Sequence, residues 1–154
     1  MMSYWLFKSE PDEYGIDHLA SEPGRKTRWD GIRNYQARNH LRDRVRRGDR
    51  VLFYHSSCRH TGVSGIIEVV SDPYPDPSQF DSSSGYYDPR ATREEPRWYC
   101  VDVKLVERFA EVIPTSVLKA HADTADLEIF SQGRLSVSPV SCKQWRAIQF
   151  LKDD

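Results

Sequence analysis

The chain has 154 residues, which is enough for one well-buried core and too few for two ordinary domains, so we expect a single domain over residues 2–152. Apolar residues make up 38 % and charged residues 29 % of the chain, as in ordinary globular proteins. No apolar run reaches the roughly 20 residues of a membrane-spanning helix, and the N-terminus lacks the basic start of a signal peptide. We therefore expect no membrane partner.

The cysteines predict an intracellular protein without a metal site. The chain has three of them, Cys58, Cys100 and Cys142, and no Cys-x-x-Cys pair. An odd count without such a pair suggests neither a disulfide framework nor a zinc site. We expect free thiols, no metal, no cofactor and a monomer. The compartment should be reducing, which means the cytoplasm or, in a eukaryote, the nucleus.

The first predicted elements are short. Residues 3–9 (SYWLFKS) form an aromatic strand, and a helix covers about 16–20. Residues 29–34 (WDGIRN) are predicted to form a turn, because Gly31 and Asn34 tolerate a positive φ.

An arginine-rich helix is predicted from Tyr35 to Arg47, with Gly48 ending it. Its apolar stripe has the i, i+4 spacing of one helix face and consists of Ala37, Leu41 and Val45. A second stripe with the same spacing consists of Arg38, Arg42 and Arg46.

The second half of the chain is predicted to hold strands and one final helix. The strands cover 49–56, 62–70, 97–109 and 134–140. The helix covers 141–152 and begins with a capping box of Ser141 and Gln144. Short helices between strands, without a βαβ rhythm, predict an α+β fold with a small, mostly antiparallel barrel.

Residues 71–96 form a long segment without a strand or helix pattern. It holds five of the nine prolines and four aromatic residues. A long irregular loop is usually functional or disordered, and disordered segments are poor in aromatic residues. We expect an ordered flap lying across the domain.

The basic residues are concentrated in one segment, although the net charge is only −1. Residues 25–50 hold ten Lys or Arg and three Asp or Glu. An anionic partner would need such a segment, with Arg38 and Arg42 facing its phosphates. A solvated helix face would give the same pattern, so both interpretations remain open.

Aromatic and small polar residues lie together at three chain turns. Trp29 precedes Asp30 and Gly31, the run Tyr54-His55-Ser56 ends a strand, and Lys8-Ser9-Glu10 ends the first strand. A planar heterocycle needs a ring to stack on and polar groups to read its edge, and stacking contributes ~1–3 kcal/mol per base. We favour a site for Trp29, exposed in a polar turn. Tyr54 fits the core equally well, and Lys8-Ser9-Glu10 also fits a solvated strand end.

We find no sequence pattern of an enzyme. The chain has no Gly-x-Ser-x-Gly, no phosphate-binding glycine loop and no His-Glu-x-x-His. His55 and His60 flank Cys58, so a Cys–His dyad is conceivable, but a small apolar role for Cys58 is favoured. We expect no catalytic residue.

Several segments together identify a family. WLFKSEP, WDGIRNYQARN, GDRVLFYHS, YPDP, YYDP, PRWYCVDV and RLSV, in this order, resemble the EVE domain over Tyr4 to about Leu151. The resemblance implies a PUA-like pseudo-barrel. It also implies a module that recognises a modified base in DNA or RNA, such as a 5-modified cytosine, by extruding the base into an aromatic cage. The related ASCH domains imply an alternative, a small amidohydrolase acting on a modified nucleoside.

The resemblance and the turns together give the expected site, with Trp29 as the first ring of the cage. The residues expected to line the base pocket are Lys8, Ser9, Glu10, Trp29, Asp30, Gly31, Asn34, Tyr54, His55 and Trp98. The residues expected to bind phosphate are Arg33, Arg38 and Arg42.

Overall fold

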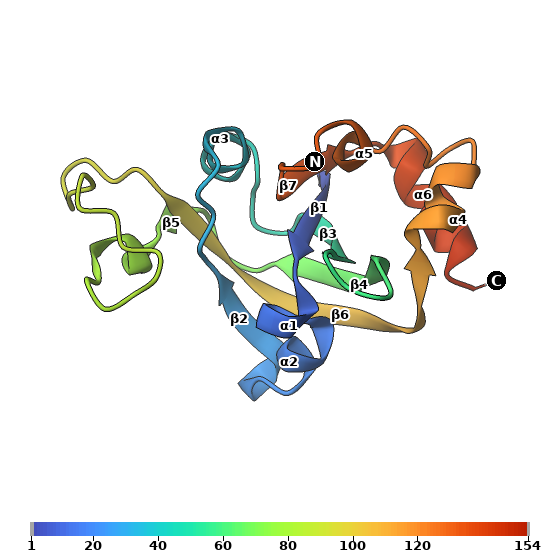
Figure 1. Ribbon diagram of the computed structural model, residues 1–154, viewed down its shortest axis with the longest axis horizontal. Helices are drawn as coiled ribbons and strands as arrows, with labels where there is room; N and C mark the ends of the chain where they lie inside the picture. The colour runs from blue at the N-terminus through green and yellow to red at the C-terminus, as the bar shows by residue number, and fades with distance from the viewer. Residues whose placement is uncertain (1, 154) are drawn as a thin grey trace.

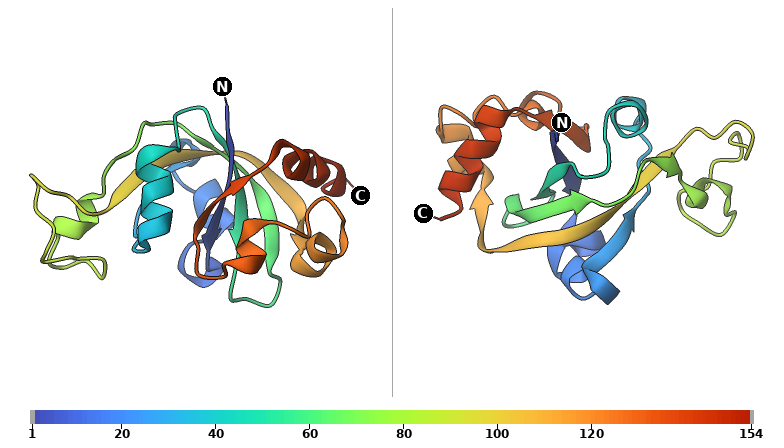
Figure 2. Two further views of the ribbon diagram at one scale, coloured as in Figure 1. Left: turned by 90° about the horizontal axis from the view of Figure 1, so that it is seen from above. Right: turned by 180° about the vertical axis from the view of Figure 1, so that it is seen from behind.

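The computed structural model describes residues 2–153, which form one sheet with short helices around it (Figures 1 and 2). The strands are β1 (Tyr4–Ser9), β2 (Lys26–Trp29), β3 (Arg50–His55), β4 (Gly62–Val69), β5 (Tyr74–Pro75), β6 (Tyr99–Pro114) and β7 (Val137–Val140). The helices are α1 (Pro11–Tyr14), α2 (Ile16–Ala20), α3 (Tyr35–Asp43), α4 (Thr115–Ala120), α5 (Glu128–Ser131) and α6 (Cys142–Leu151), with 3-10 turns η1 (Pro23–Arg25) and η2 (Pro77–Phe80).

The sheet has seven strands in the order β2-β6-β4-β3-β1-β7, with β5 paired to β6. The pair β1–β3 is parallel and the other pairs are antiparallel. The register of β6 against β4 shifts at two places, which bends the sheet. The predicted α+β class is confirmed. Closure of a barrel is not observed, because β2 and β7 remain the two ends of the hydrogen-bonded order.

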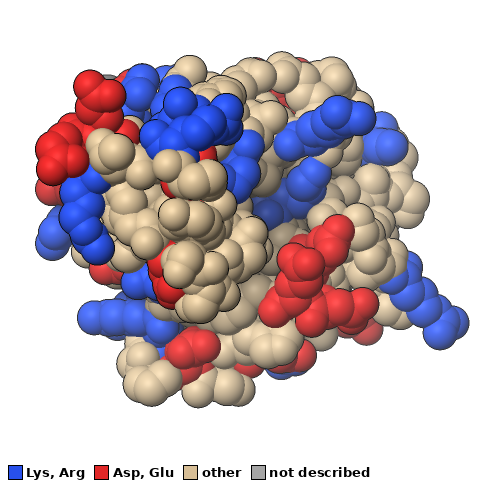
Figure 3. All heavy atoms as spheres, turned by 60° about the vertical axis from the view of Figure 1, so that its left-hand side comes forward, with Lys and Arg blue, Asp and Glu red and all other residues tan. Residues whose placement is uncertain are grey.

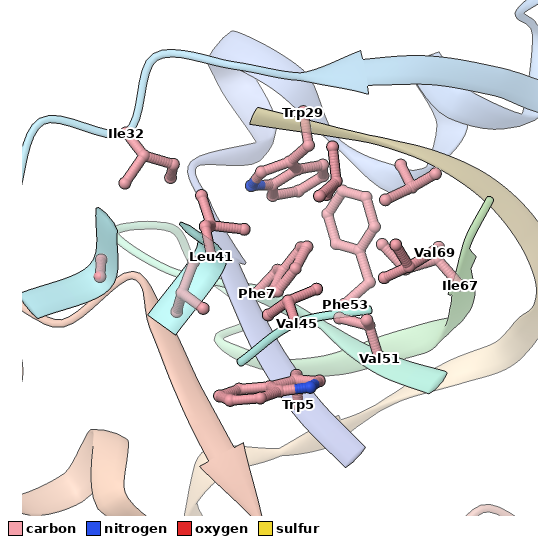
Figure 4. Packing of buried hydrophobic residues seen from close by; sticks show 14 of the residues in the cluster. Trp5, Phe7, Trp29, Ile32, Leu41, Val45, Val51, Phe53, Ile67 and Val69 are labelled. Carbon is pink, nitrogen blue, oxygen red and sulfur yellow. The ribbon is translucent and has the colours of Figure 1, made fainter. Parts of the chain in front are cut away.

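Alternation along β1 separates two hydrophobic clusters. Trp5 and Phe7 point into one cluster and Leu6 into the other, as successive residues of a strand must. The first cluster lies between the sheet and α3, and Figure 4 shows Trp29 beside Phe7 and Phe53 within it. The second cluster lies between the sheet and the helices α4 and α6. The site described below lies at the edge of the first cluster.

Helix α3 is shorter than predicted and ends at Asp43, whereas the prediction placed its end at Arg47. The chain leaves the helix so that Val45 is buried and so that the carboxylate of Asp49 accepts a hydrogen bond from the Arg46 amide at 2.9 Å. The same carboxylate accepts the indole N–H of Trp5 at 2.9 Å. Gly48 has φ +94° in the turn before β3, so it serves that turn and not the helix end.

The later elements follow the prediction with shifted ends. β6 runs to Pro114, five residues past the predicted end, and β7 begins at Val137, since the residues before it form a turn. The capping box of α6 is present, with Ser141 Oγ accepting from the Gln144 amide at 3.1 Å. Among residues 2–153, no helix combines the length and apolarity that crossing a membrane requires.

The flap (residues 71–96) is ordered, but it does not lie across the domain. It leaves the sheet next to β5 and projects beyond α3 at one end of the molecule (Figures 1 and 2). Buried polar side chains hold it, since the Gln79 amide donates to the carbonyls of Asp76 and Trp98 at 2.8 Å each. The indole N–H of Trp98 donates to the carboxylate of Asp88 at 2.8 Å.

Candidate nucleic-acid interface

A cavity of about 350 Å³ opens where β2 ends and the chain turns towards α3. This volume falls in the range of ~300–1,000 Å³ that is typical of small-ligand sites. The cavity brings together the end of β1, helix α1, strand β2 and the flap. Its lining residues are Ser9, Glu13, Tyr14, Thr27, Arg28, Trp29, Asp30 and Tyr86.

Trp29 borders this cavity, but it does not lie in an exposed turn as predicted. It is the last residue of β2, and only 6 % of it is exposed. Its ring packs edge-on against Phe53 at 5.2 Å and tilted against Phe7 at 5.4 Å between centroids. Trp29 is therefore a floor of the cavity and part of the core. Replacing a core Trp by Ala costs about 3–5 kcal/mol, so such a variant would test folding before binding.

Two tyrosines give the cavity its more accessible rings. The ring of Tyr14 meets Trp29 edge-on at 6.4 Å between centroids. Tyr86 reaches back from the flap and is 44 % exposed. Its ring lies directly over Gly31, where an added Cβ would be 2.7 Å from Tyr86 Cζ. Gly31 also has φ +79°, so the predicted turn glycine lets the flap approach this closely.

The polar groups of the cavity are mostly hydrogen-bond acceptors. Ser9 Oγ donates to the Tyr14 carbonyl at 2.7 Å, which leaves its lone pairs available. One carboxylate oxygen of Asp30 accepts from Arg28 Nε at 3.1 Å, and the other has no protein donor within residues 2–153. Glu13 is exposed and has no side-chain hydrogen bond in the same range. These acceptors suit a ligand edge that carries an amino group.

Arg33 is a structural contact between the turn and the flap, and not the free phosphate ligand that we expected. Its five N–H donors, the full number of a guanidinium, are all used. They reach the Tyr86 carbonyl at 2.7 and 3.2 Å, Asp76 at 3.1 Å, Ser78 Oγ at 3.1 Å and the Ile32 carbonyl at 3.0 Å. A phosphate would have to displace one of these partners.

The carboxylate of Asp76 is buried at the other side of this contact. It accepts hydrogen bonds from the Gly31 amide at 2.9 Å, from the Ser78 amide at 2.8 Å and from Ser78 Oγ at 2.6 Å. Burial by itself would raise the pKa of Asp76. The hydrogen bonds from Ser78, Gly31 and Arg33 outweigh burial and hold this pKa below its ordinary value. Asp76 therefore stays ionised and ties the flap to Gly31.

Arg38 and Arg42 differ in how free they are. Arg42 Nε and Nη2 donate to the carboxylate of Asp43 at 2.7 and 2.9 Å. Arg38 donates to the Arg97 carbonyl at 2.7 Å and forms no ion pair within residues 2–153. Figure 3 shows this end of the molecule, where Lys and Arg side chains alternate with acidic clusters. The basic segment is therefore not one uninterrupted basic surface.

Three of the expected pocket residues serve the ends of secondary-structure elements. The Asn34 side chain caps α3 by accepting from the Ala37 amide at 2.9 Å, and its φ is −106°, so it does not adopt the predicted positive φ. Glu10 is the N-cap position of α1. Lys8 donates to the Gly133 carbonyl, and burial lowers the pKa of Lys8 against the opposing effect of Glu10.

Three more of the expected pocket residues lie outside the cavity wall. Tyr54 is buried in the second cluster, where its hydroxyl bonds Thr115 Oγ1 at 2.6 Å. His55 Nε2 accepts from the Ile16 amide at 3.1 Å. Trp98 is 4 % exposed and packs between the flap and α3. The structure therefore brings together only Ser9, Trp29 and Asp30 of the predicted set as lining residues, with Gly31 beside them.

A larger cavity of about 600 Å³ lies at the start of α4. Its lining residues are Arg59, His60, Thr61, Glu111, Val112, Pro114, Thr115 and Ser116. None of them is Trp, Tyr or Phe, so this cavity offers no large ring for a base to stack on. Size alone would favour it, but its chemistry does not suit a nucleobase.

Comparison with known proteins identifies the family. Residues 3–151 match the EVE domain. The chain belongs to the EVE domain family. Thymocyte nuclear protein 1 of Homo sapiens is 35 % identical over 170 residues, which cover 99 % of this chain and 75 % of that protein.

Solved structures share the fold of this EVE domain. A hypothetical protein from Leishmania major superposes with a TM-score of 0.94 at 42 % identity, over 99 % of this chain and 96 % of that one. The human THYN1 protein in complex with 5-methylcytosine-containing DNA superposes with a TM-score of 0.94 at 33 % identity, over 99 % of this chain and 98 % of that one.

Sequence reasoning missed much of the cavity wall of this EVE domain. The missed residues are Glu13, Tyr14, Thr27, Arg28 and Tyr86. A signal for Thr27 existed, because alternation in the run KTRW places Thr27 and Trp29 on one face of a strand. The aromatic content of the flap pointed to Tyr86 only as a ring in an ordered loop.

The described residues show where the cysteines and metal-ligand side chains lie. All three cysteines are free, and Cys100 is fully buried. Burial raises the pKa of the Cys100 thiol to about 12. Among residues 2–153, no group of three His, Cys, Asp or Glu side chains could hold a metal ion.

Proposed function

We propose that this EVE domain binds DNA that carries a modified base, such as a 5-modified cytosine, and takes the extruded base into the cavity at Trp29. The observation that carries the proposal is the cavity itself, which combines three aromatic rings with free carboxylate and hydroxyl acceptors. The human THYN1 complex with 5-methylcytosine-containing DNA supports it, since that protein superposes over 98 % of its chain.

The rings and acceptors have complementary roles in this proposal. Tyr14 and Tyr86 offer stacking surfaces, and Trp29 closes the floor. Asp30 and Glu13 accept hydrogen bonds from an exocyclic amino group, which cytosine has and thymine lacks. Extruding a base costs a few kcal/mol. Stacking at ~1–3 kcal/mol per base, with added phosphate contacts, offsets that cost.

Binding without catalysis is part of the proposal. Two aliphatic hydroxyl groups, those of Ser9 and Thr27, lie in the cavity wall. Ser9 Oγ donates to the Tyr14 carbonyl, and no histidine of residues 2–153 lines the cavity. An activated serine needs an adjacent base that accepts its proton. Incubation with N4-acylated cytidine is therefore expected to give no turnover, whereas product formation would favour the amidohydrolase alternative.

The test replaces Tyr86 by Ala, with Tyr87→Ala as the matched control. The two side chains are neighbours and almost equally exposed, at 44 % and 43 %, but only Tyr86 lines the cavity. Titration calorimetry would compare oligonucleotides with 5-methylcytosine and with cytosine at one position, in DNA and in RNA. Tyr86→Ala should weaken binding of the preferred modified DNA roughly five- to 150-fold, because ~1–3 kcal/mol of stacking is lost.

The control defines what would refute this. Tyr87→Ala should leave both affinities unchanged. Equal weakening of modified and unmodified DNA by Tyr86→Ala, with melting temperatures intact, would mean that no base enters the cavity.

A further inference from the structure

A continuous series of stacked aromatic rings and guanidinium groups connects the cavity with α3. Starting at the cavity, Arg33 Cζ lies 5.4 Å from the ring centroid of Tyr86 and 5.3 Å from that of Trp98. The Trp98 ring lies 4.9 Å from that of Tyr35, with 31° between the planes. Arg38 Cζ lies 4.9 Å from the Tyr35 centroid. We call these five residues the stacking ladder.

The inner part of the stacking ladder, near the cavity, and its outer part, at α3, differ in how accessible they are to a ligand. Trp98 is 4 % exposed, and every donor of Arg33 is already used, so the inner part holds the flap in place. Tyr35 is 49 % exposed at the first position of α3. A tyrosine that served only to pack the flap would not need to present half of its surface to solvent.

The charges around Tyr35 favour an anionic ligand. Arg97 Nη1 donates to the Tyr35 hydroxyl at 3.2 Å, and Arg38 donates to the Arg97 carbonyl at 2.7 Å. Neither guanidinium forms an ion pair with a carboxylate in residues 2–153, whereas Arg42 is paired with Asp43. An exposed ring between two unpaired guanidinium groups has the chemistry that binds a nucleotide, with a plane for the base and donors for the phosphate.

We propose that the outer end of the stacking ladder, Tyr35 and Arg38, together with the neighbouring Arg97, binds a nucleotide that flanks the extruded one in the same strand. This rests on the proposed function, because Tyr86 belongs both to the cavity and to the ladder. The flanking base stacks on the Tyr35–Arg38 pair, and its phosphate accepts hydrogen bonds from Arg38 and Arg97. These contacts carry no information on base identity, so the surface adds affinity and leaves modification selectivity to the cavity.

The experiment measures Tyr35→Ala and Tyr35→Phe against three ligands. The ligands are the free nucleoside 5-methyl-2′-deoxycytidine, an oligonucleotide containing 5-methylcytosine, and the same oligonucleotide with cytosine. Tyr35→Ala should weaken both oligonucleotides by the same factor, roughly five- to 150-fold. It should leave the nucleoside affinity unchanged. Tyr35→Phe keeps the ring and should behave as wild type towards all three.

Separate outcomes distinguish this proposal from the proposed function. If wild-type protein does not prefer the modified oligonucleotide, the cavity proposal fails, yet the loss caused by Tyr35→Ala on the unmodified oligonucleotide still supports the ladder. If Tyr35→Ala keeps its melting temperature and binds both oligonucleotides like wild type, the ladder is only a packing feature. A loss limited to the nucleoside would also overturn it.

A second variant covers the case in which Tyr35→Ala does not fold. Arg97→Gln removes a charge but keeps the backbone amide of residue 97, which donates to Gln79 Oε1 at 2.9 Å. If Arg97 binds one phosphate, the slope of log K against log salt should become shallower by about 0.7–0.9. An unchanged slope would contradict the phosphate contact and with it the proposed surface.

Discussion

His55 shows how one side chain ties the end of β3 to helix α2. Its Nε2 accepts a hydrogen bond from the Ile16 amide at 3.1 Å, and its ring meets Phe53 edge-on at 5.3 Å. Only a neutral imidazole has a lone pair at Nε2 with which to accept. Burial lowers the pKa of His55, and the opposing charge of Asp17 does not cancel this effect.

The lowered pKa of His55 predicts a loss of stability in mild acid. As the pH falls, the unfolded chain binds a proton at His55 near the ordinary pKa of 6.5, and the folded protein binds it only at a lower pH. The contribution of His55 to stability is therefore complete above pH 6.5, and it is lost as the pH falls from 6.5 through the lowered pKa of the folded protein. Urea unfolding at pH 8 and pH 5 would measure the difference. His55→Gln keeps a hydrogen-bond acceptor but cannot titrate. It should therefore reduce the difference in the free energy of unfolding between pH 8 and pH 5.

Two other histidines set the comparison for this measurement. His40 also has a pKa lowered by burial, so His55→Gln should remove only part of the acid sensitivity. His60 is exposed, and His60→Gln serves as the control, which should keep the full loss of stability between pH 8 and pH 5. A pH dependence of His55→Gln equal to that of wild type would show that the proton is taken up elsewhere.

Trp29 illustrates what a local pattern decides about a residue and what it does not. Its polar neighbours, Arg28 and Asp30, suggested a solvent-exposed turn. In a strand the same neighbours point away while the central side chain points inward, and Trp29 is the last residue of such a strand. Trp29 does border a cavity, but the exposure predicted for it from the sequence was wrong, and its role in a site stays a prediction.

At the level of elements, the flap depends on buried polar contacts. Its aromatic residues predicted that it would be ordered, and this was correct. Its position was not predictable, because the contacts that set it join residues far apart in the chain. Arg33 and the carbonyl of Tyr86, for example, are separated by 53 positions.

Removing the carboxylate of Asp76 should destabilise the flap. Asp76→Ala leaves Arg33 without its ion pair and the Gly31 and Ser78 amides without an acceptor, which costs about 3–5 kcal/mol for a buried pair. Urea unfolding monitored by tryptophan fluorescence would measure the change. Because the flap carries Tyr86, affinity for modified DNA should fall in the same variant.

Asp81 provides the matched control within the flap. It is exposed, and among the described residues its side chain accepts hydrogen bonds from Ser83 alone. Asp81→Ala should change the free energy of unfolding by less than about 0.5 kcal/mol. Equal stability of the Asp76 and Asp81 variants would contradict a structural role for the buried carboxylate.

At the level of the whole molecule, the distribution of charge matters more than the net charge of −1. Helix α3 and the flap lie at one end and α6 at the other (Figure 1). The long strands were predictable from their alternation of apolar and polar residues. The EVE resemblance was predictable from motifs such as WDGIRNYQARN. The open sheet order and the pairing of each arginine were not, since both depend on contacts between distant segments.

The salt dependence of DNA affinity should show which arginine of α3 contacts phosphate. Within residues 2–153, Arg38 has no carboxylate partner and Arg42 has one, so Arg38→Glu should flatten the slope of log K against log salt more than Arg42→Glu. Each lost phosphate contact is expected to contribute about 0.7–0.9 to the slope. Fluorescence anisotropy at several salt concentrations would measure it.

Arg146, exposed on α6 at the far end of the molecule, is the control position for this series. Arg146→Glu should leave the slope unchanged. A slope altered equally by Arg146→Glu and Arg38→Glu would mean that DNA responds to the total charge and not to the α3 end.

The guanidinium of Arg33 has a consequence for the timing of binding. Four of its five hydrogen bonds go to Asp76, Ser78 and the Tyr86 carbonyl, so the flap cannot release one of these groups without straining the others. We therefore expect these contacts to break together if the flap opens. Because Tyr86 forms one wall of the cavity, the proposed function predicts that the lifetime of a bound base is limited by the rate at which these contacts break.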